Sequence, residues 1–259
     1  MLVSEVMLQQ TGVGRVVPAY SAFIGRFPTL ASLSRASLAD VLRAWSGLGY
    51  NRRARDLHRI ARLFPRELPA TRDGLDELPG VGAYTAGAVS CFSRGENVAF
   101  ADTNVRRVLG RALLGRIATE REAVALDKQL VPRLRADRWH HALMDLGATV
   151  CLARTPRCEA CPIATGCRSR GRVVRAAPRR QAAFATSDRR VRGRIVAMLR
   201  DSGGMTLRAL ADRIRDARTA RLARDLANEG LVELAHSHVR LPEDTLAPSA
   251  HDPATTKPR

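Results

Sequence analysis

A short turn rich in proline and glycine constrains the fold of this chain more than any other feature. It spans residues 78–84 and reads L-P-G-V-G-A-Y. Pro79 fixes one φ angle, and Gly80 and Gly82 permit backbone conformations that other residues rarely adopt. The small residues that follow can start a helix, whose first N–H groups bind phosphate without reading base sequence. The turn therefore predicts two helices joined by a phosphate-binding hairpin, although alone it also fits an ordinary tight turn.

The charge balance favours a polyanionic partner. The chain has 259 residues, a net charge of +18 and 43 basic against 25 acidic side chains, and only Lys128 and Lys257 are lysines. A broad positive field of this kind is typical of proteins that bind nucleic acid. No apolar run is long enough to span a bilayer, and the first residues do not resemble a signal peptide. We therefore expect a cytoplasmic, nucleoid-associated protein with no membrane partner, in which cysteines stay reduced.

Hydrophobic periodicity predicts helices from the start of the chain to the cysteines. One stripe comprises Val16, Val17, Tyr20, Phe23, Ile24 and Phe27. Ser37 and Asp102 are placed to cap the helices that follow them, and Trp45 is expected in the core. The fold class predicted is all-α.

The pattern changes after the cysteines. Residues 189–241 predict three helices and a short hairpin, which together suggest a small winged-helix-like module. The domains expected are a helical domain with the hairpin (1–101), a cysteine-cluster domain (102–167), a basic linker (168–188), the module (189–241) and a disordered tail (242–259).

Four cysteines form a second strong motif with the spacing C-x6-C-x2-C-x5-C. They are Cys151, Cys158, Cys161 and Cys167. Zinc and a [4Fe-4S] cluster both accept four thiolates, but zinc sites favour two C-x2-C pairs, so the spacing favours the iron–sulfur cluster. The arginines around these cysteines suggest a loop that contacts DNA phosphates. Cys91 lies in an apolar helix and is expected in the core.

Six collinear motifs resemble the adenine DNA glycosylases of the MutY family, within the helix-hairpin-helix glycosylase superfamily. They are the segments 4–11 (S-E-V-M-L-Q-Q-T), 45–50 (W-S-G-L-G-Y), 78–87, 102–105 (D-T-N-V) and 144–148 (M-D-L-G-A), and the cysteine spacing. The resemblance covers roughly residues 2 to 167. It implies a helix-hairpin-helix fold with a [4Fe-4S] cluster, and removal of adenine mispaired with 8-oxoguanine or guanine.

The resemblance assigns four catalytic residues. Glu5 lies among apolar residues, so burial should raise its pKa and let it hold a proton for the leaving base. Asp102, expected at a helix N-terminus, should stay ionised and face the developing sugar cation. Tyr84 is implied near that cation, and Asn104 is implied to orient the nucleophile or Asp102. Taken singly, each of these residues also fits a structural role.

The resemblance also assigns contacts with double-stranded DNA. The target base must leave the duplex, and four residues match the positions that fill the gap and contact the opposing purine: Gln10, Thr11, Leu48 and Tyr50. The hairpin residues implied to bind the backbone are Pro79, Gly80, Val81 and Gly82. We expect a monomer on duplexes that contain A:8-oxoguanine or A:G.

Two departures from the family bear on activity. Family members have a segment before the Glu5 helix, so we expect either a start assigned too late or a truncated chain with a less supported cluster domain. Residues 189–241 are too short for the Nudix-like domain of many members, so selectivity for 8-oxoguanine should be weaker or rest on Gln10, Leu48 and the C-terminal module.

Two other functions stay open at this point. A thymine-mismatch glycosylase shares the hairpin, the tyrosine and the cysteines, whereas the glutamines before Thr11 favour adenine. A non-catalytic iron–sulfur DNA-binding protein would use the hairpin and the C-terminal module without Glu5 and Asp102. Lyase relatives carry a lysine where this chain has Tyr84, so we expect base removal without efficient strand cleavage.

Overall fold

The computed structural model describes residues 1–174 and 183–242. The chain divides into two units, one made of residues 1–9 and 68–181 and the other of residues 10–67 and 182–259. Each is described by itself. Residues 175–182 of the expected linker and residues 243–259 of the expected tail lie outside the described residues. Within the described ranges, no helix is long and apolar enough to cross a membrane.

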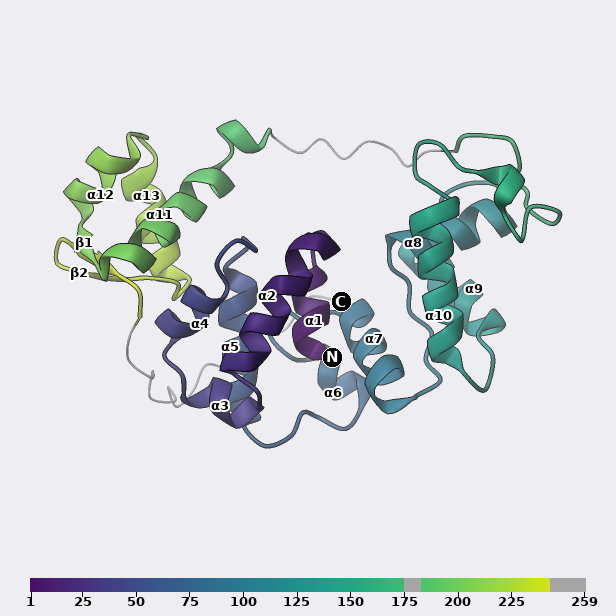
Figure 1. Ribbon diagram of the computed structural model, residues 1–259, viewed down its shortest axis with the longest axis horizontal. Helices are drawn as coiled ribbons and strands as arrows, with labels where there is room; N and C mark the ends of the chain where they lie inside the picture. Colours follow the sequence, from purple (N-terminus) through teal and green to yellow (C-terminus); the bar gives the residue numbers. More distant parts are fainter. Residues whose placement is uncertain (175–182, 243–259) are drawn as a thin grey trace. The chain divides into compact units, whose positions relative to one another are not determined.

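In its described part, the first unit contains helices and connecting loops but no strand (Figure 1). Its helices are α1 (Leu2–Leu8), α6 (Arg72–Asp76), α7 (Ala83–Arg94), α8 (Thr103–Leu109), α9 (Glu120–Leu130) and α10 (Ala136–Asp145), with π-helical turns η1 (Gly110–Leu114) and η2 (Leu146–Val150) and a 3-10 turn η3 (Cys158–Ala160). Helix α1 packs on α7, and α8 packs on α9, α10 and η2. Helix α10 also packs on α7, so α7 and α8 contact a common helix.

The second unit starts with helices α2 (Val13–Arg26), α3 (Leu30–Arg35), α4 (Leu38–Ala44) and α5 (Arg52–Leu63). Trp45 and Phe23 are fully buried and meet edge to face, with ring centroids 5.7 Å apart. Ser37 caps α4, as its position predicts, by accepting a hydrogen bond from the Asp40 N–H. Val17, expected on the apolar stripe of α2, is instead 58% exposed, so that part of the prediction is wrong.

The C-terminal module, residues 188–241, completes the second unit. It contains α11 (Asp188–Ser202), β1 (Met205–Thr206), α12 (Leu207–Ile214), α13 (Thr219–Asn228), β2 (Glu233–Ala235) and β3 (His238–Arg240), and a 3-10 turn η4 (Phe184–Thr186) precedes it. The expected hairpin is β2–β3. Strand β1 adds an antiparallel pair, so that the sheet order is β1-β3-β2. The module packs on α4 through α11.

A buried polar network stabilises the first unit. Asp127 and His140 are fully buried, and His140 Nε2 lies 2.8 Å from Asp127 Oδ2. Asp127 also accepts hydrogen bonds from the Trp139 indole at 2.6 Å and from the Phe100 N–H at 3.1 Å. The Phe100 ring stacks on His140 with centroids 3.9 Å apart. Cys91 is buried beside this network, as predicted, and burial raises its pKa to about 11.

Replacing one partner of this network should destabilise the protein strongly. Asp127→Asn replaces a carboxylate that has three buried hydrogen-bond partners with an amide that also donates, and leaving a buried polar group unpaired costs about 1 to 3 kcal/mol. Chemical denaturation should show this drop in the free energy of unfolding. Glu120→Gln, an exposed change in the same helix α9, should shift it by about 0.5 kcal/mol or less. Equal stability of the two variants would contradict the role given to Asp127.

Candidate active site

Glu5 lies on α1 and is buried, with 8% of its surface exposed. Its neighbours Val6 and Met7 belong to the core, and α1 packs on α7. Burial raises the pKa of Glu5 above its usual value, the nearby charge of Asp102 raises it further, and a hydrogen bond from Tyr84 opposes the increase. A carboxyl group in such a setting can hold a proton and donate it to a substrate.

Tyr84 lies on the first turn of α7, directly after the hairpin. Its hydroxyl donates a hydrogen bond to Glu5, and burial together with the charges of Glu5 and Asp102 raises the pKa of the phenol. The ring also contacts Phe100 edge to face, with centroids 5.7 Å apart. Tyr84 is therefore a neutral donor within electrostatic range of both carboxylates.

Asp102 is the N-cap of α8, as predicted. Its Oδ1 accepts the Val105 N–H at 2.7 Å, and its Oδ2 accepts the Asn104 amide at 2.8 Å. Both oxygens are therefore fixed by donors, and an N-cap position favours negative charge. Asn104 orients Asp102, which is one of the two roles that the resemblance implied for it.

Arg107 extends this chain of hydrogen bonds toward the cysteines. Its Nη2 donates to Asn104 Oδ1 at 2.7 Å and to the Gly147 carbonyl at 2.6 Å, and its Nε donates to the Cys151 carbonyl at 2.7 Å. The Asp102 carboxylate and the start of the cysteine loop are thereby connected through two side chains. Arg107 was not among the predicted site residues, because nothing in the sequence around it distinguishes it from the other arginines.

Gly147 should be intolerant of a side chain. A Cβ at this position would lie 2.6 Å from Asn104 Cβ, which is closer than such atoms approach. Gly147→Ala should displace Asn104 from Asp102, slow base release about tenfold or more, and cost about 1 to 3 kcal/mol of stability. Single-turnover kinetics and thermal melts measure both effects. Gly166→Ala, whose Cβ would meet no atom within 4 Å, is the matched control. An unchanged rate in Gly147→Ala would contradict this account of Asn104.

The hairpin joins α6 and α7, as the sequence predicts. Gly80 has a φ of 72°, in the left-handed region that favours glycine, and Gly82 is the N-cap of α7 without a side-chain hydrogen bond. Val81 is buried, whereas Pro79 is half-buried and Gly80 exposed. Gln9 Nε2 approaches the Gly80 carbonyl at 3.4 Å and Thr85 Oγ1 at 3.3 Å, so the end of α1 is tied to the hairpin.

The other predicted DNA-contacting residues lie in the second unit. Gln10 and Tyr50 are exposed, and both have left-handed backbones with φ values of 59° and 48°. Thr11 and Leu48 are buried, at 6% and 2% exposed. Arg53 connects them, since its Nη2 donates to Thr11 Oγ1 at 2.9 Å and to the Leu48 carbonyl at 3.1 Å. Contact of Gln10, Thr11, Leu48 and Tyr50 with DNA stays a prediction. Thr11 and Leu48 are buried beneath the loop and contact Arg53 there.

The four cysteines of the motif line one cavity, together with Arg111. None of them forms a disulfide. As they stand, no three of the described cysteine, histidine and acidic side chains are grouped closely enough to hold a metal ion. Arg111 is only 2% exposed, and its guanidinium donates to Cys151 Sγ at 3.4 Å and to the Leu152 carbonyl at 2.7 Å. The cavity therefore combines four thiols with a buried positive charge.

The fold is that of a helix-hairpin-helix protein, in which one tyrosine interacts with two carboxyl groups. Residues 3–133 match the model of the HhH-GPD superfamily of base excision DNA repair proteins. The chain belongs to this superfamily. It is similar to the adenine DNA glycosylase of Mycolicibacterium smegmatis, at 45% identity over 90% of this chain and 83% of the relative. The human adenine DNA glycosylase is 41% identical over 66% of this chain and 33% of its own length. These relatives confirm the resemblance to the MutY family.

Solved structures agree with this fold. A thermostable thymine-DNA glycosylase matches with a TM-score of 0.59 at 27% identity, covering 65% of this chain and 82% of that one. A non-covalent endonuclease III–DNA complex matches with a TM-score of 0.58 at 25% identity, covering 65% and 81%. The relatives of higher identity are adenine glycosylases, which favours adenine over thymine.

Proposed function

We propose that the chain is a DNA N-glycosylase that removes mispaired adenine from double-stranded DNA by hydrolysing the N-glycosidic bond. The observation that carries this proposal is the arrangement around Tyr84, whose hydroxyl bonds to the buried Glu5 and which lies within electrostatic range of Asp102. A proton donor and a fixed anion at one centre are what this reaction needs, because the base leaves with a proton while the sugar becomes cationic.

Glu5 is the acid of the proposed reaction. Burial raises its pKa and so favours the protonated form, from which it transfers a proton to a ring nitrogen of the extruded adenine. Protonation weakens the bond from the base to the sugar and makes the base a neutral leaving group. Tyr84, a neutral donor, stabilises the carboxylate that remains.

Asp102 stabilises the sugar as it becomes an oxocarbenium ion. Hydrogen bonds from Val105 N–H and from the Asn104 amide hold its two oxygens. A carboxylate fixed in advance stabilises a cationic transition state without the cost of reorganisation. Water then attacks C1′, its proton passes to the Glu5 carboxylate left by the first step, and an abasic site remains.

No lysine stands directly after the hairpin, since Tyr84 occupies the position that lyase relatives use for a Schiff base. A duplex with a single A:8-oxoguanine or A:G pair should therefore yield strand breaks only after alkali treatment. Gel analysis with and without alkali measures this difference. Abundant breaks before alkali would contradict monofunctional hydrolysis, and no breaks after alkali would contradict glycosylase activity itself.

We further propose that Cys151, Cys158, Cys161 and Cys167 hold a [4Fe-4S] cluster. The donor set fits such a cluster, because four unpaired thiols line one cavity beside the buried Arg111, whose charge offsets that of thiolates. When bound, the cluster supplies four iron–thiolate bonds that fold this loop. The purified protein should absorb broadly near the edge of the visible range and contain four iron atoms per chain. Zinc without iron would contradict the cluster.

The C-terminal module has the element order of a winged helix, and we propose that it is one. We also propose that the protein prefers adenine paired with 8-oxoguanine over adenine paired with other bases. The exposed residues Gln10 and Tyr50 would contact the opposite base. We propose a monomer that acts on chromosomal DNA in the cytoplasm.

A further inference from the structure

Tyr50 is an exposed aromatic ring held in an unusual backbone conformation. It is 41% exposed and has a φ of 48°, and Gly47 and Gly49 before it also have left-handed backbones. A non-glycine residue in this region is strained, and the conformation persists only where its surroundings fix it. An exposed ring on a positively charged loop suits stacking on a nucleic acid base.

Two arginines contact this ring, one close to Tyr50 in the sequence and one far from it. The Cζ of Arg53 lies 5.4 Å from the ring centroid, and the Cζ of Arg189 lies 5.9 Å from it. Arg189 Nη1 also donates a hydrogen bond of 2.7 Å to the Tyr50 hydroxyl. Burial lowers the pKa of Arg53 to about 10, so that it stays charged at neutral pH. Arg189 belongs to α11 of the C-terminal module, and Arg53 to α5.

The module is also tied to both ends of the Tyr50 loop, residues 46–52. At one end, Arg200 Nη1 donates to Ser46 Oγ at 2.7 Å. At the other end, Arg52 Nε donates to Glu229 Oε2 at 2.7 Å, and Arg192 bonds to the same carboxylate. These arginines lower the pKa of Glu229 to about 2, so it is ionised. The loop and the module are therefore coupled at three points.

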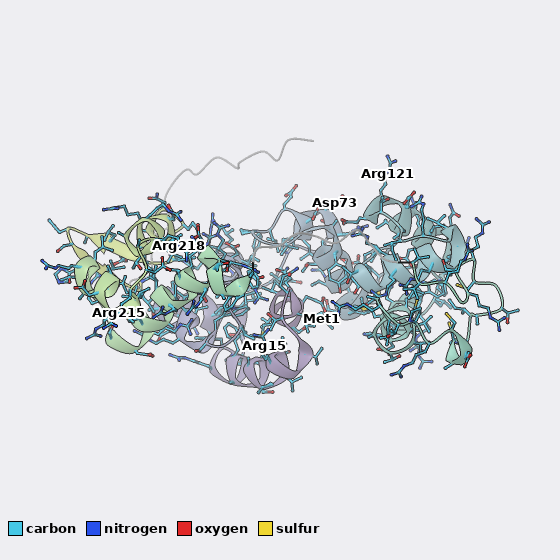
Figure 2. All side chains as sticks on the ribbon, turned by 90° about the horizontal axis from the view of Figure 1, so that it is seen from above. Met1, Arg15, Asp73, Arg121, Arg215 and Arg218 are labelled. Atoms are coloured by element: carbon cyan, nitrogen blue, oxygen red, sulfur yellow. The ribbon has the colours of Figure 1, made fainter. Side chains whose placement is uncertain are left out.

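The third helix of the module is less suited to reading DNA directly. Arg218 pairs with Asp216 at 2.8 Å and with Asp188 at 2.9 Å. Arg221 pairs with Asp188 at 2.8 Å and with Asp225 at 3.0 Å. Three aspartates thus offset the charge of the two arginines at the start of α13, even though arginine nitrogens lie at many outer side-chain tips in Figure 2.

We infer that Arg189 is a positioning residue, which holds the Tyr50 ring for stacking on the DNA and so allows the C-terminal module to set the preference for the base opposite adenine. The inference rests on the proposed function. In this inference the C-terminal module acts on DNA recognition through the Tyr50 loop. A winged helix that bound DNA by itself would instead act through α13.

The test compares opposite-base preference in four variants: Arg189→Ala, Tyr50→Phe, the double variant and Arg224→Ala. Arg224 is an exposed arginine of α13 and controls for loss of charge on the module. The measured quantity is the Kd for a duplex with adenine opposite cytosine divided by the Kd for a duplex with adenine opposite 8-oxoguanine. The adenosine carries a 2′-fluorine, which disfavours the sugar cation and prevents release. Ratios cancel any uniform loss of phosphate attraction.

Arg189→Ala and Tyr50→Phe should each lower this ratio about fivefold, and the double variant should lower it no further, because both changes remove the same hydrogen bond. Arg224→Ala should leave the ratio unchanged. A ratio unaffected by Arg189→Ala, additive effects in the double variant, or a larger effect of Arg224→Ala would overturn the inference. Binding is measured without catalysis, so failure of the proposed activity would show separately, as absence of base release from unmodified duplexes.

Discussion

Glu5→Gln should reduce single-turnover base release by at least about a thousandfold, because it removes the proton donor and leaves the rest of the site in place. A glutamine carbonyl can still accept the Tyr84 hydrogen bond, and the side chain has nearly the same volume. Duplex affinity should change by less than about threefold. Exposed Glu120→Gln serves as the control and should keep the wild-type rate.

The stability of Glu5→Gln separates lost chemistry from lost folding. The folded state binds the Glu5 proton more tightly than the unfolded state, since burial raises its pKa. The free energy of unfolding of the wild-type protein therefore decreases as pH rises from the ordinary carboxyl pKa through the raised one. Glu5→Gln removes this dependence, so its Tm at neutral pH should be no lower than that of the wild type. A markedly lower Tm would mean that the carboxyl group is structural.

Asp102→Asn should have an effect of similar size for a different reason. The variant loses the anion that faces the sugar cation, while asparagine remains a good N-cap, so α8 should stay formed. We expect base release to fall at least about a thousandfold and the free energy of unfolding to change by about 1 kcal/mol or less. Rapid-quench kinetics and denaturation measure the two quantities.

A matched control for this change is Asp137→Asn, in the first turn of α10 of the same unit. It also removes one negative charge near a helix N-terminus, and its rate should stay within about twofold of the wild type. If Asp102→Asn released adenine at the control rate, the account of Asp102 as the stabilising anion would be wrong.

Local signals predicted much of this site. The N-cap role of Asp102 follows from one residue and the apolar pattern after it, and the structure confirms it. The hairpin was predictable because proline and glycine restrict or free the backbone at known positions. The strand β1, in contrast, is too short to leave a periodic pattern and was not anticipated.

Contacts between distant segments were beyond local patterns. The network of Asp127 and His140 joins α9 and α10, and the sequence does not show which partner each polar side chain meets. Nothing in the sequence separates Arg111 from the many exposed arginines of the chain. Only 2% of its surface is exposed, because carbonyl groups of the cysteine loop accept its hydrogen bonds. Val17 was wrongly assigned to the core because it directly follows the buried Val16. Successive residues of a helix point about 100° apart, so Val17 lies at the edge of the apolar stripe and faces outward.

If Glu5 gives its proton to the leaving base beside the fixed Asp102 carboxyl group, base release depends on the protonated form of Glu5, and a pH profile of single-turnover base release measures this dependence. The rate should decrease about tenfold for each pH unit above the raised pKa of Glu5, and the weak residual rate of Glu5→Gln should lack this decrease. A rate that does not vary between about pH 5 and 9, or the same decrease in both proteins, would contradict this role of Glu5.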